Sequence, residues 1–245
     1  SLSPEGATVD SELICQAGTV AEDDQDPISL KVIWRKNGEV LKEEEAVDGK
    51  ATLSGAFSKG EILECEVVPD DGYEEGEALV SNPISIDNTA PTEPEVDLAY
   101  NEPQVGEAFR CELSVESMDL DGDTLSYHYR WWVNDFQAPG LMGSQVFPEQ
   151  LVADAEGRAV KKGDSVRCRV WADDGTENSQ PVDSEVVTLL NTPPVGGQVE
   201  VDYYSLLENS VLTCDAEDAE DADGDAITWT YAWIRNNAEI EGAVT

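Results

Sequence analysis

The chain has 245 residues, with 53 acidic and 14 basic side chains and a formal net charge of -39 at pH 7. This charge would repel nucleic acid and anionic membrane surfaces, so we expect neither as a partner and regard cations as the natural partners. Hydrophobic residues make up 40% of the chain and six residues are Trp, which excludes a disordered acidic tail. No apolar run approaches the roughly 20 residues of a membrane helix, so we expect no membrane insertion of this segment.

An acidic loop that leads into a strand occurs three times, at residues 22–37, 119–134 and 221–236, and the first copy is the weakest. From Leu125 to Trp131, large apolar residues alternate with Ser, His and Arg, which predicts a strand with one buried face. Cysteines precede a Trp by 19 or 20 residues in each copy: Cys15 and Trp34, Cys111 and Trp131, Cys214 and Trp233. The repeat is therefore about one hundred residues long, and we expect these three Trp side chains in the core.

The first two repeats each contain a second cysteine, Cys65 and Cys168, in matching Lys-Gly segments. The third repeat reaches Thr245 without one, and Ser1 corresponds to Asp97 of the second repeat. We therefore expect an incomplete first strand in the first repeat, a truncated third repeat, and a longer array in which further copies of the repeat are the partners, including as a homopolymer.

Two proline-containing segments separate the repeats. Asn88-Thr-Ala-Pro91 and Asn191-Thr-Pro-Pro194 each follow an alternating run, and proline ends a strand because it removes a hydrogen-bond donor. The expected domains are residues 1–90, 91–193 and 194–245, the last being the N-terminal half of a repeat.

Short alternating segments are separated by turn signals such as Asn37-Gly38, Asp71-Gly72 and Asp174-Gly175, and long helical patterns are absent. This pattern predicts an all-β fold of tandem sandwich domains. The order Cys, Trp, Cys has immunoglobulin spacing. The chain resembles the tandem immunoglobulin-like repeats, related to polycystic-kidney-disease-type and cadherin-like modules, of large bacterial surface and secreted proteins.

The resemblance implies that Cys15 bonds Cys65 and that Cys111 bonds Cys168, with the Trp packed on each bridge. Buried free thiols are the alternative, but matched pairs in each complete repeat favour disulfides and hence an oxidising, extracellular or cell-surface location. Antibody-type domains have Tyr two residues before the second Cys, where this chain has Leu63 and Val166.

The recurrent acidic loops are the most informative motif. Asp119, Asp121 and Asp123 alternate, so their side chains converge from one side of an extended loop that turns at Gly122. Carboxylates this close repel each other unless a hard cation neutralises them, and calcium accepts about six to eight oxygen ligands in flexible geometry. The spacing differs from that of an EF-hand. We expect calcium, with a solvated acidic turn as the alternative.

Further oxygen ligands are expected at the same end of the domain. In an immunoglobulin-type sandwich the loops after both cysteine strands share one end, so Asp173 and Asp174 should approach the acidic loop. The segment Asp-Asn-Thr-Ala-Pro also resembles the cadherin linker, in which calcium stiffens the joint. The expected ligands are Asp87, Asn88, Asp119, Asp121, Asp123, Asp173 and Asp174, with Asp221, Asp223 and Asp225 repeating the loop.

Catalysis is not expected, because the one histidine, His128, falls on the polar side of a strand and the acids recur with the repeat, unlike an active site. We expect a structural or adhesive array: a rigid acidic stalk or filament that binds calcium and surface ligands. The alternative is a spacer or carbohydrate-binding accessory region of a secreted hydrolase, for which Trp132 and Trp229 are the candidate sugar-binding aromatics.

Overall fold

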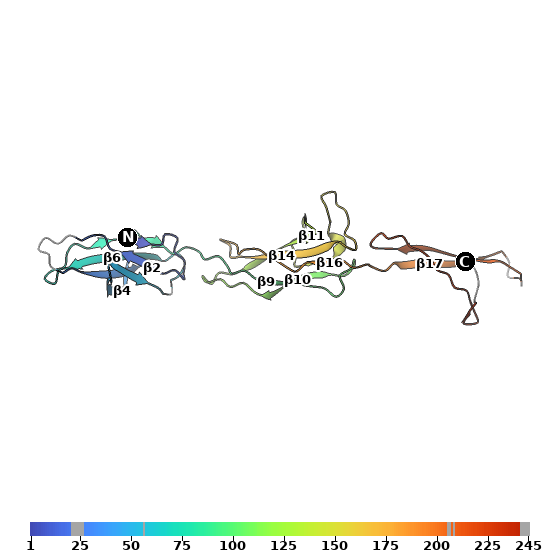
Figure 1. The fold of residues 1–245 in the computed structure, drawn as a ribbon, viewed down its shortest axis with the longest axis horizontal. Coiled ribbons are helices and arrows are strands. Elements are labelled where there is room, and N and C mark those ends of the chain that lie inside the picture. The colour runs from blue at the N-terminus through green and yellow to red at the C-terminus, as the bar shows by residue number, and fades with distance from the viewer. Residues whose placement is uncertain (21–26, 56, 205–206, 208, 241–245) are drawn as a thin grey trace. The chain divides into compact units, whose positions relative to one another are not determined.

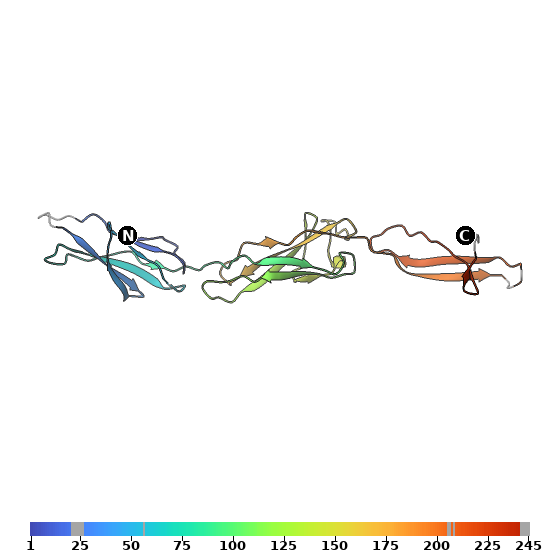
Figure 2. The ribbon, with the colours of Figure 1, turned by 60° about the horizontal axis from the view of Figure 1, so that its bottom comes forward.

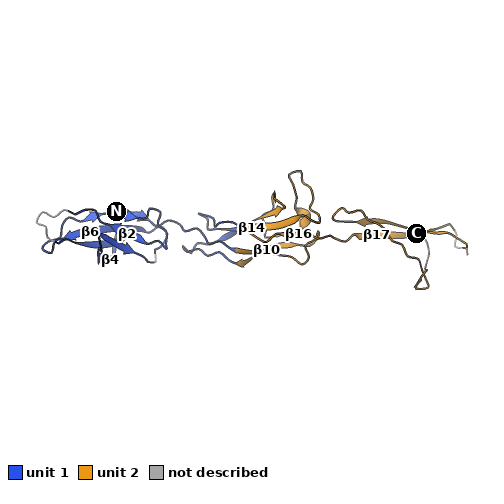
Figure 3. Cartoon of the chain, in the orientation of Figure 1, with its two compact units in different colours: residues 1–94, 115–127, 171–181 blue, residues 95–114, 128–170, 182–245 orange. Residues whose placement is uncertain are grey.

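The computed structural model describes residues 1–20, 27–55, 57–204, 207 and 209–240. The chain divides into two compact units, residues 1–94, 115–127 and 171–181 in the first and residues 95–114, 128–170 and 182–245 in the second (Figure 3). Two loops of the second repeat therefore belong to the same unit as the first repeat. The weak first copy of the acidic loop, with Glu22, Asp24 and Asp26, lies outside the described residues.

Nearly all regular structure is β-strand (Figure 1). The first repeat contains β1 (Leu2–Ser3), β2 (Leu13–Gln16), β3 (Ser29–Lys36), β4 (Glu39–Glu45), β5 (Lys50–Leu53), β6 (Ile62–Asp70), β7 (Leu79–Val80) and β8 (Ile84–Ser85). The second contains β9 (Glu95–Ala99), β10 (Phe109–Val115), β11 (Ser126–Val133), β12 (Phe136–Ala138), β13 (Gln145–Val146), the 3-10 turn η1 (Pro148–Gln150), β14 (Ser165–Asp173), β15 (Val182–Asp183) and β16 (Val187–Thr188). The last segment contains β17 (Val195–Tyr203), β18 (Leu212–Glu220), β19 (Ile234–Arg235) and β20 (Ala238–Glu239). The all-β fold class is confirmed, and no helix among the described residues is long and apolar enough to cross a membrane.

The first repeat consists of two sheets joined by a disulfide. One sheet has the order β1-β2-β5 and the other β4-β3-β6-β7, with β8 also paired to β6. Cys15 on β2 bonds Cys65 on β6, as the resemblance implies. Trp34 on β3 lies opposite Cys65 in the register and is fully buried. In the chain-entropy model, closing a loop of 50 residues stabilises a fold by about 4 kcal/mol, a large share of one domain's stability.

The β3–β4 hairpin shows how local sequence sets the strand register. Asn37 and Gly38 have φ angles of 52° and 83°, the left-handed conformation that a two-residue hairpin turn requires. The Asn37 side chain then accepts a hydrogen bond from the backbone N–H of Ile62, at 2.9 Å. Asn134 does the same for Ser165, at 3.0 Å. In the first two repeats the turn asparagine thus connects the hairpin to the start of the second cysteine strand.

The second repeat follows the same plan. Its sheets have the orders β13-β10-β9 and β12-β11-β14-β15, with β16 paired to β14. Cys111 on β10 bonds Cys168 on β14, again as implied. Trp131 is fully buried, and its indole N–H donates to the carbonyl of Gly143 at 2.9 Å. The core positions expected for Trp34 and Trp131 are therefore observed.

The last segment differs from the expectation. It contains the antiparallel pair β17–β18 and the hairpin β19–β20 (Figure 2). Trp233, expected in the core, is only half-buried, because the described part of this segment offers only two two-stranded sheets in place of the larger sheets around Trp34 and Trp131. Cys214 is likewise partly exposed and forms no disulfide with any described cysteine.

Candidate functional site

Three segments of the first unit bring together the expected ligands of the candidate site. The linker after β8 supplies Asn88 and Thr89, the loop between β10 and β11 supplies Asp119 to Asp123, and the turn after β14 supplies Asp174. The site therefore combines the exit of the first repeat with two loops at one end of the second, where the sequence places both acidic loops.

The Asp119–Asp123 loop is held by its own carboxylates. Gly122 has a φ of 81°, which permits the tight turn, and the backbone N–H of Asp123 donates to Asp119 Oδ1 at 3.0 Å. The backbone N–H of Thr89 donates to Asp121 Oδ2 at 2.6 Å. Because Thr89 belongs to the linker, this hydrogen bond also connects the loop to the segment that enters the repeat.

The turn after β14 is organised around Asp174. Its Oδ1 accepts the backbone N–H groups of Thr176 and Glu177, and its Oδ2 accepts the Asn88 side-chain amide at 2.9 Å. Burial raises the pKa of Asp174, but these hydrogen bonds and the nearby positive charge of Lys59 outweigh burial and hold the pKa below its ordinary value. Asp174 is therefore ionised at neutral pH.

Three carboxylates of this group could share one cation. Asp119, Asp123 and Asp174 each offer an oxygen, and these oxygens lie within 4.8 Å of one another. Asp119 Oδ2 and Asp121 Oδ1 are buried and have no hydrogen-bond partner among the residues that the structure describes. Buried oxygens are normally paired, and calcium binds oxygens at about 2.3 to 2.6 Å, so oxygens separated by twice that distance can surround it. The residues present fit a calcium ion.

Lys59, in the turn between β5 and β6, contacts both the acidic loop and the linker. Its ammonium group binds Asp123 and donates to Asn88 Oδ1 at 2.9 Å. The hydrogen bond to Asp123 raises the pKa of Lys59, and the charges of Asp121 and Asp174 add to the effect. Sequence reasoning missed this residue. The available signal was the Lys-Gly dipeptide at matching positions, Lys59-Gly60 and Lys162-Gly163.

The same network recurs in the second unit. Lys162 binds Asp225 and donates to Asn191 Oδ1 at 3.0 Å, while the Thr192 backbone N–H donates to Asp223 Oδ2 at 2.6 Å. The Asp225 N–H donates to Asp221 Oδ1 at 3.0 Å, as the Asp123 N–H does to Asp119. Within the described residues, no carboxylate from another loop joins this group as Asp174 joins the first.

Two further expected ligands, Asp87 and Asp173, make contacts with backbone groups. Asp87 directs Oδ2 towards Gly6, 3.8 Å from where a Cβ would stand there, and its backbone N–H donates to the carbonyl of Ala7. The Asn88 side-chain amide donates to Asp174 Oδ2 at 2.9 Å, whereas the contacts of Asp87 are with the Gly6–Ala7 segment. Asp173 accepts the backbone N–H of Gly175 at 2.8 Å and shapes the turn.

No family model and no curated protein sequence matches the chain. Similar solved structures include the segment of two fibronectin type-III domains from chicken tenascin, at 13% identity, covering 77% of this chain and 96% of that chain with a TM-score of 0.38. The FN1–FN3 domains of chicken CNTN1 are similar at 12% identity, covering 77% of this chain and 66% of that chain with a TM-score of 0.30. Both TM-scores lie under 0.5, so the fold assignment rests on the sheets and disulfides. Neither structure is a cadherin-like or polycystic-kidney-disease-type module, and that resemblance stays a prediction.

Proposed function

We propose that this chain belongs to a non-catalytic structural and adhesive array, an acidic extracellular stalk or filament whose repeats are stapled by disulfides and whose joints bind calcium. The observation that carries the proposal is the recurrence of one network: a Lys-Gly turn, an Asn-Thr linker and an acidic loop meet in the same way around Lys59 and around Lys162. A catalytic site rarely recurs at each repeat, whereas a contact that joins consecutive repeats is expected to recur at each junction.

The disulfides support an oxidising location. Each links the two sheets of a repeat and closes a loop of 50 or 57 residues. Such bonds persist in extracellular compartments and are rare in the cytosol. The disulfides stabilise each repeat of an extracellular array, because each repeat then keeps its fold independently of its neighbours.

Charge at the first joint supports calcium. Asp119, Asp121, Asp123 and Asp174 carry four formal negative charges, and the Lys59 ammonium group offsets one of them, so a formal charge of about -3 in this set remains for a bound cation to neutralise. Buried, unpartnered oxygens of Asp119 and Asp121 favour an ion over a solvated turn. The affinity expected for an extracellular module is about 10⁻⁴ to 10⁻³ M.

The accessory carbohydrate-binding alternative draws less support. Arg167 and Arg169 lie over the Trp132 ring, with their guanidinium carbons 5.3 and 4.7 Å from its centroid. The Trp229 ring packs on Gly197, where an added Cβ would lie only 2.8 Å from it. Trp132 is therefore engaged by arginines of its own repeat, and Trp229 packs on its own repeat while remaining 40% exposed.

Calorimetric titration of the chelator-treated chain with calcium tests the proposal. We expect binding that is weakened strongly by Asp119→Asn or Asp174→Asn and unchanged by Asp135→Asn, which removes the same charge at an exposed turn. Absence of calcium binding, or equal weakening by all three substitutions, would show that the loops are solvated acidic turns.

A further inference from the structure

The second repeat presents a cluster of arginines on the outward face of the sheet β12-β11-β14-β15. Side chains alternate along β11 and β14, so Trp131 and Cys168 point into the core while Trp132, Arg167 and Arg169 point outwards. The two guanidinium carbons lie 5.3 and 4.7 Å from the centroid of the Trp132 ring. Stacking on an indole orients a guanidinium group and leaves the N–H donors at its edge for a carboxylate.

Asp183 on β15 shows how this face binds a carboxylate. Its two oxygens accept hydrogen bonds from Arg169 at 2.6 and 2.8 Å. Arg167 Nε is 3.8 Å from the same carboxylate and, although buried, has no hydrogen-bond partner among the described residues. Arg130 occupies another outward position of β11 and adds a third positive charge. Apart from Asp173, where β14 ends, Asp183 is the one acid on these four strands, so the face keeps an excess of positive charge. The basic face is defined by Arg130, Trp132, Arg167 and Arg169.

The edge of this sheet carries no acid that would repel an acidic partner. Residues 136–148, which include β12 and the segment after it, contain no charged side chain. The corresponding edge strand of the first repeat, β4, instead contains Glu39, Glu43, Glu44 and Glu45. In a chain with a net charge of -39, an arginine-rich face beside an uncharged edge is a place where a carboxylate-rich surface can approach.

The first repeat has acids at the positions that hold arginines in the second. Glu64 and Glu66 flank the second cysteine of the first repeat, as Arg167 and Arg169 flank Cys168. The two strands occupy the same place in their sheets, β6 in the order β4-β3-β6-β7 and β14 in the order β12-β11-β14-β15. The two repeats therefore present equivalent faces with opposite charge.

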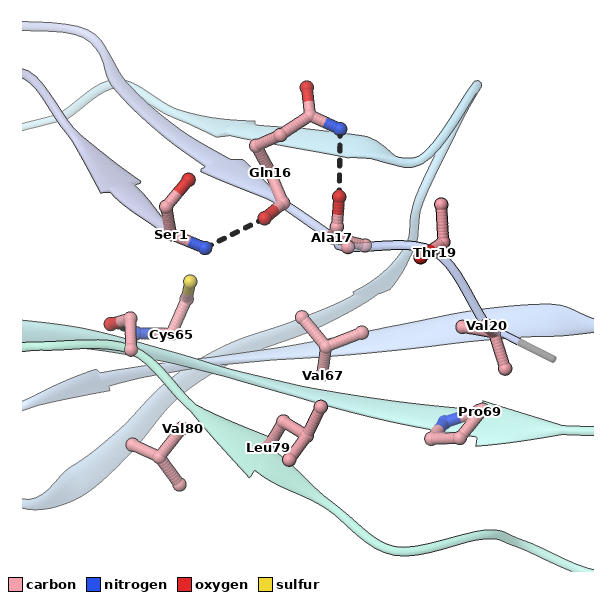
Figure 4. Close-up of a pocket in the computed structure, with 12 residues that line it drawn as sticks. Ser1, Gln16, Ala17, Thr19, Val20, Cys65, Val67, Pro69, Leu79 and Val80 are labelled. Atoms are coloured by element: carbon pink, nitrogen blue, oxygen red, sulfur yellow. Dashed lines mark hydrogen bonds between the residues drawn. The ribbon is translucent and has the colours of Figure 1, made fainter.

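The outward face of the first repeat is acidic as a whole. Figure 4 shows Cys65 and Val67 of β6 pointing into the hollow beside β2, so the intervening Glu66 points to the opposite face of the sheet. Arg35 donates to Glu66 at 2.9 and 2.6 Å and offsets one charge, and Lys31 on the same face offsets another. The register places more glutamates than bases here, and these glutamates define the acidic face: Glu43, Glu45, Glu64 and Glu66.

We propose that copies of this chain associate by docking the basic face of the second repeat of one copy onto the acidic face of the first repeat of another. Other approaches of two copies bring acids against acids, so repulsion elsewhere adds specificity to the attraction between these faces. At 0.15 M salt the repulsion between exposed charges is largely screened beyond about 8 Å, so charges at the contact dominate. Because the two faces differ, the contact is heterologous, and each copy keeps a face for a further copy.

This inference rests on the proposed array function and names the surfaces through which one array binds another. The basic and acidic faces share no residue with the candidate calcium site. Association through them is therefore independent of calcium at the joints.

Sedimentation velocity of the full chain in 0.15 M sodium chloride with a chelator tests the proposal. We expect association that increases with protein concentration. Arg167→Glu and Glu64→Arg each reverse one charge of one face, and each should weaken self-association at least about tenfold. Arg110→Glu is the control, because it reverses the charge of an exposed arginine on β10, in the other sheet, and should leave association unchanged.

An equimolar mixture of the two variants gives a complementary measurement. Arg167→Glu keeps the acidic face intact and Glu64→Arg keeps the basic face intact. The mixture should therefore associate at the parent's affinity, although neither variant does so alone. Restored association also shows that both variants are folded. Arg130→Glu, measured in parallel, should behave like Arg167→Glu.

Four results would overturn the proposal. The parent chain could remain monomeric, or Arg110→Glu could weaken association as much as Arg167→Glu does. The mixture could fail to associate while both variants keep the circular dichroism spectrum of the parent. Association that requires calcium would place the contact at the joints instead. Calcium titration of the parent is evaluated separately: association in chelator without any calcium binding contradicts the proposed joint alone, and calcium binding without association contradicts this inference alone.

Discussion

Adjacent tryptophans on β11 have opposite surroundings. Trp131 has no exposed surface and donates its indole N–H to a carbonyl. Trp132 points to the other face of the strand, where it stacks against Arg167 and Arg169. A cation–π contact contributes about 0.5 to 1 kcal/mol at an exposed site, which is less than the free energy gained by burying a Trp side chain in the core.

Replacing Trp131 by Ala should therefore lower the free energy of unfolding of the second repeat by about 3 to 5 kcal/mol, because it leaves a cavity and an unpaired carbonyl. Trp132→Ala is the matched control and should cost much less. Chemical denaturation followed by circular dichroism measures both. Equal losses at the two positions would mean that the side chains do not alternate as described.

Asp164 should make stability depend on pH. Burial raises its pKa, but the Arg158 guanidinium, the Asn134 amide and the backbone N–H of Lys161 together lower it to about 2. A carboxyl whose pKa is depressed on folding stabilises the fold above its unfolded pKa of about 3.9 and loses that contribution as pH falls through the folded value. We expect about 2 kcal/mol to disappear between pH 4 and pH 2.

Asp164→Asn should abolish this part of the pH dependence. The variant should be less stable than the parent at pH 7, and the two should converge as pH approaches 2. Urea denaturation across this range measures the difference, with Asp135→Asn as a control that should retain the parent's slope. A difference between parent and Asp164→Asn that stays constant with pH would contradict the assignment.

At the scale of elements, the strands and disulfides were predictable because alternation and cysteine spacing are local signals. The pairing of Cys111 with Cys168 needed only the repeat and its resemblance. The Lys59 contact to Asp123 was not predictable, because it joins a turn of one repeat to a loop of the next, 64 residues away.

The Lys59 turn supports a prediction about competition between cations. Its ammonium group already binds Asp123, so calcium must share or displace it. Lys59→Met should therefore raise calcium affinity, and in the calcium-free chain it should speed hydrogen exchange in residues 115–127. Lys50→Met removes the same charge from an exposed position at the start of β5 and is the control. Unchanged affinity in Lys59→Met would show that the lysine does not occupy the calcium position.

For the whole molecule, a charge of -39 makes general salt screening a rival explanation for any effect of calcium. The Debye length falls from about 30 Å at 0.01 M salt to about 8 Å at 0.15 M, so sodium chloride alone should reduce repulsion between repeats. Calcium chloride at about 1 mM adds only about 3 mM of ionic strength, which is negligible against 0.15 M. A response to calcium in that buffer must then come from bound ions.

Small-angle scattering in 0.15 M sodium chloride makes this distinction. Calcium at about 1 mM, near the expected dissociation constant, should narrow the distribution of the maximum dimension, because a bound ion ties the linker and both loops together. Chelation should widen the distribution without unfolding the repeats, since each keeps its disulfide. Asp121→Ala removes the carboxylate that holds the Thr89 backbone and should behave like the chelated parent. If chelation changes nothing and Asp121→Ala matches the untreated parent, the joint is set by Lys59 and the linker without calcium.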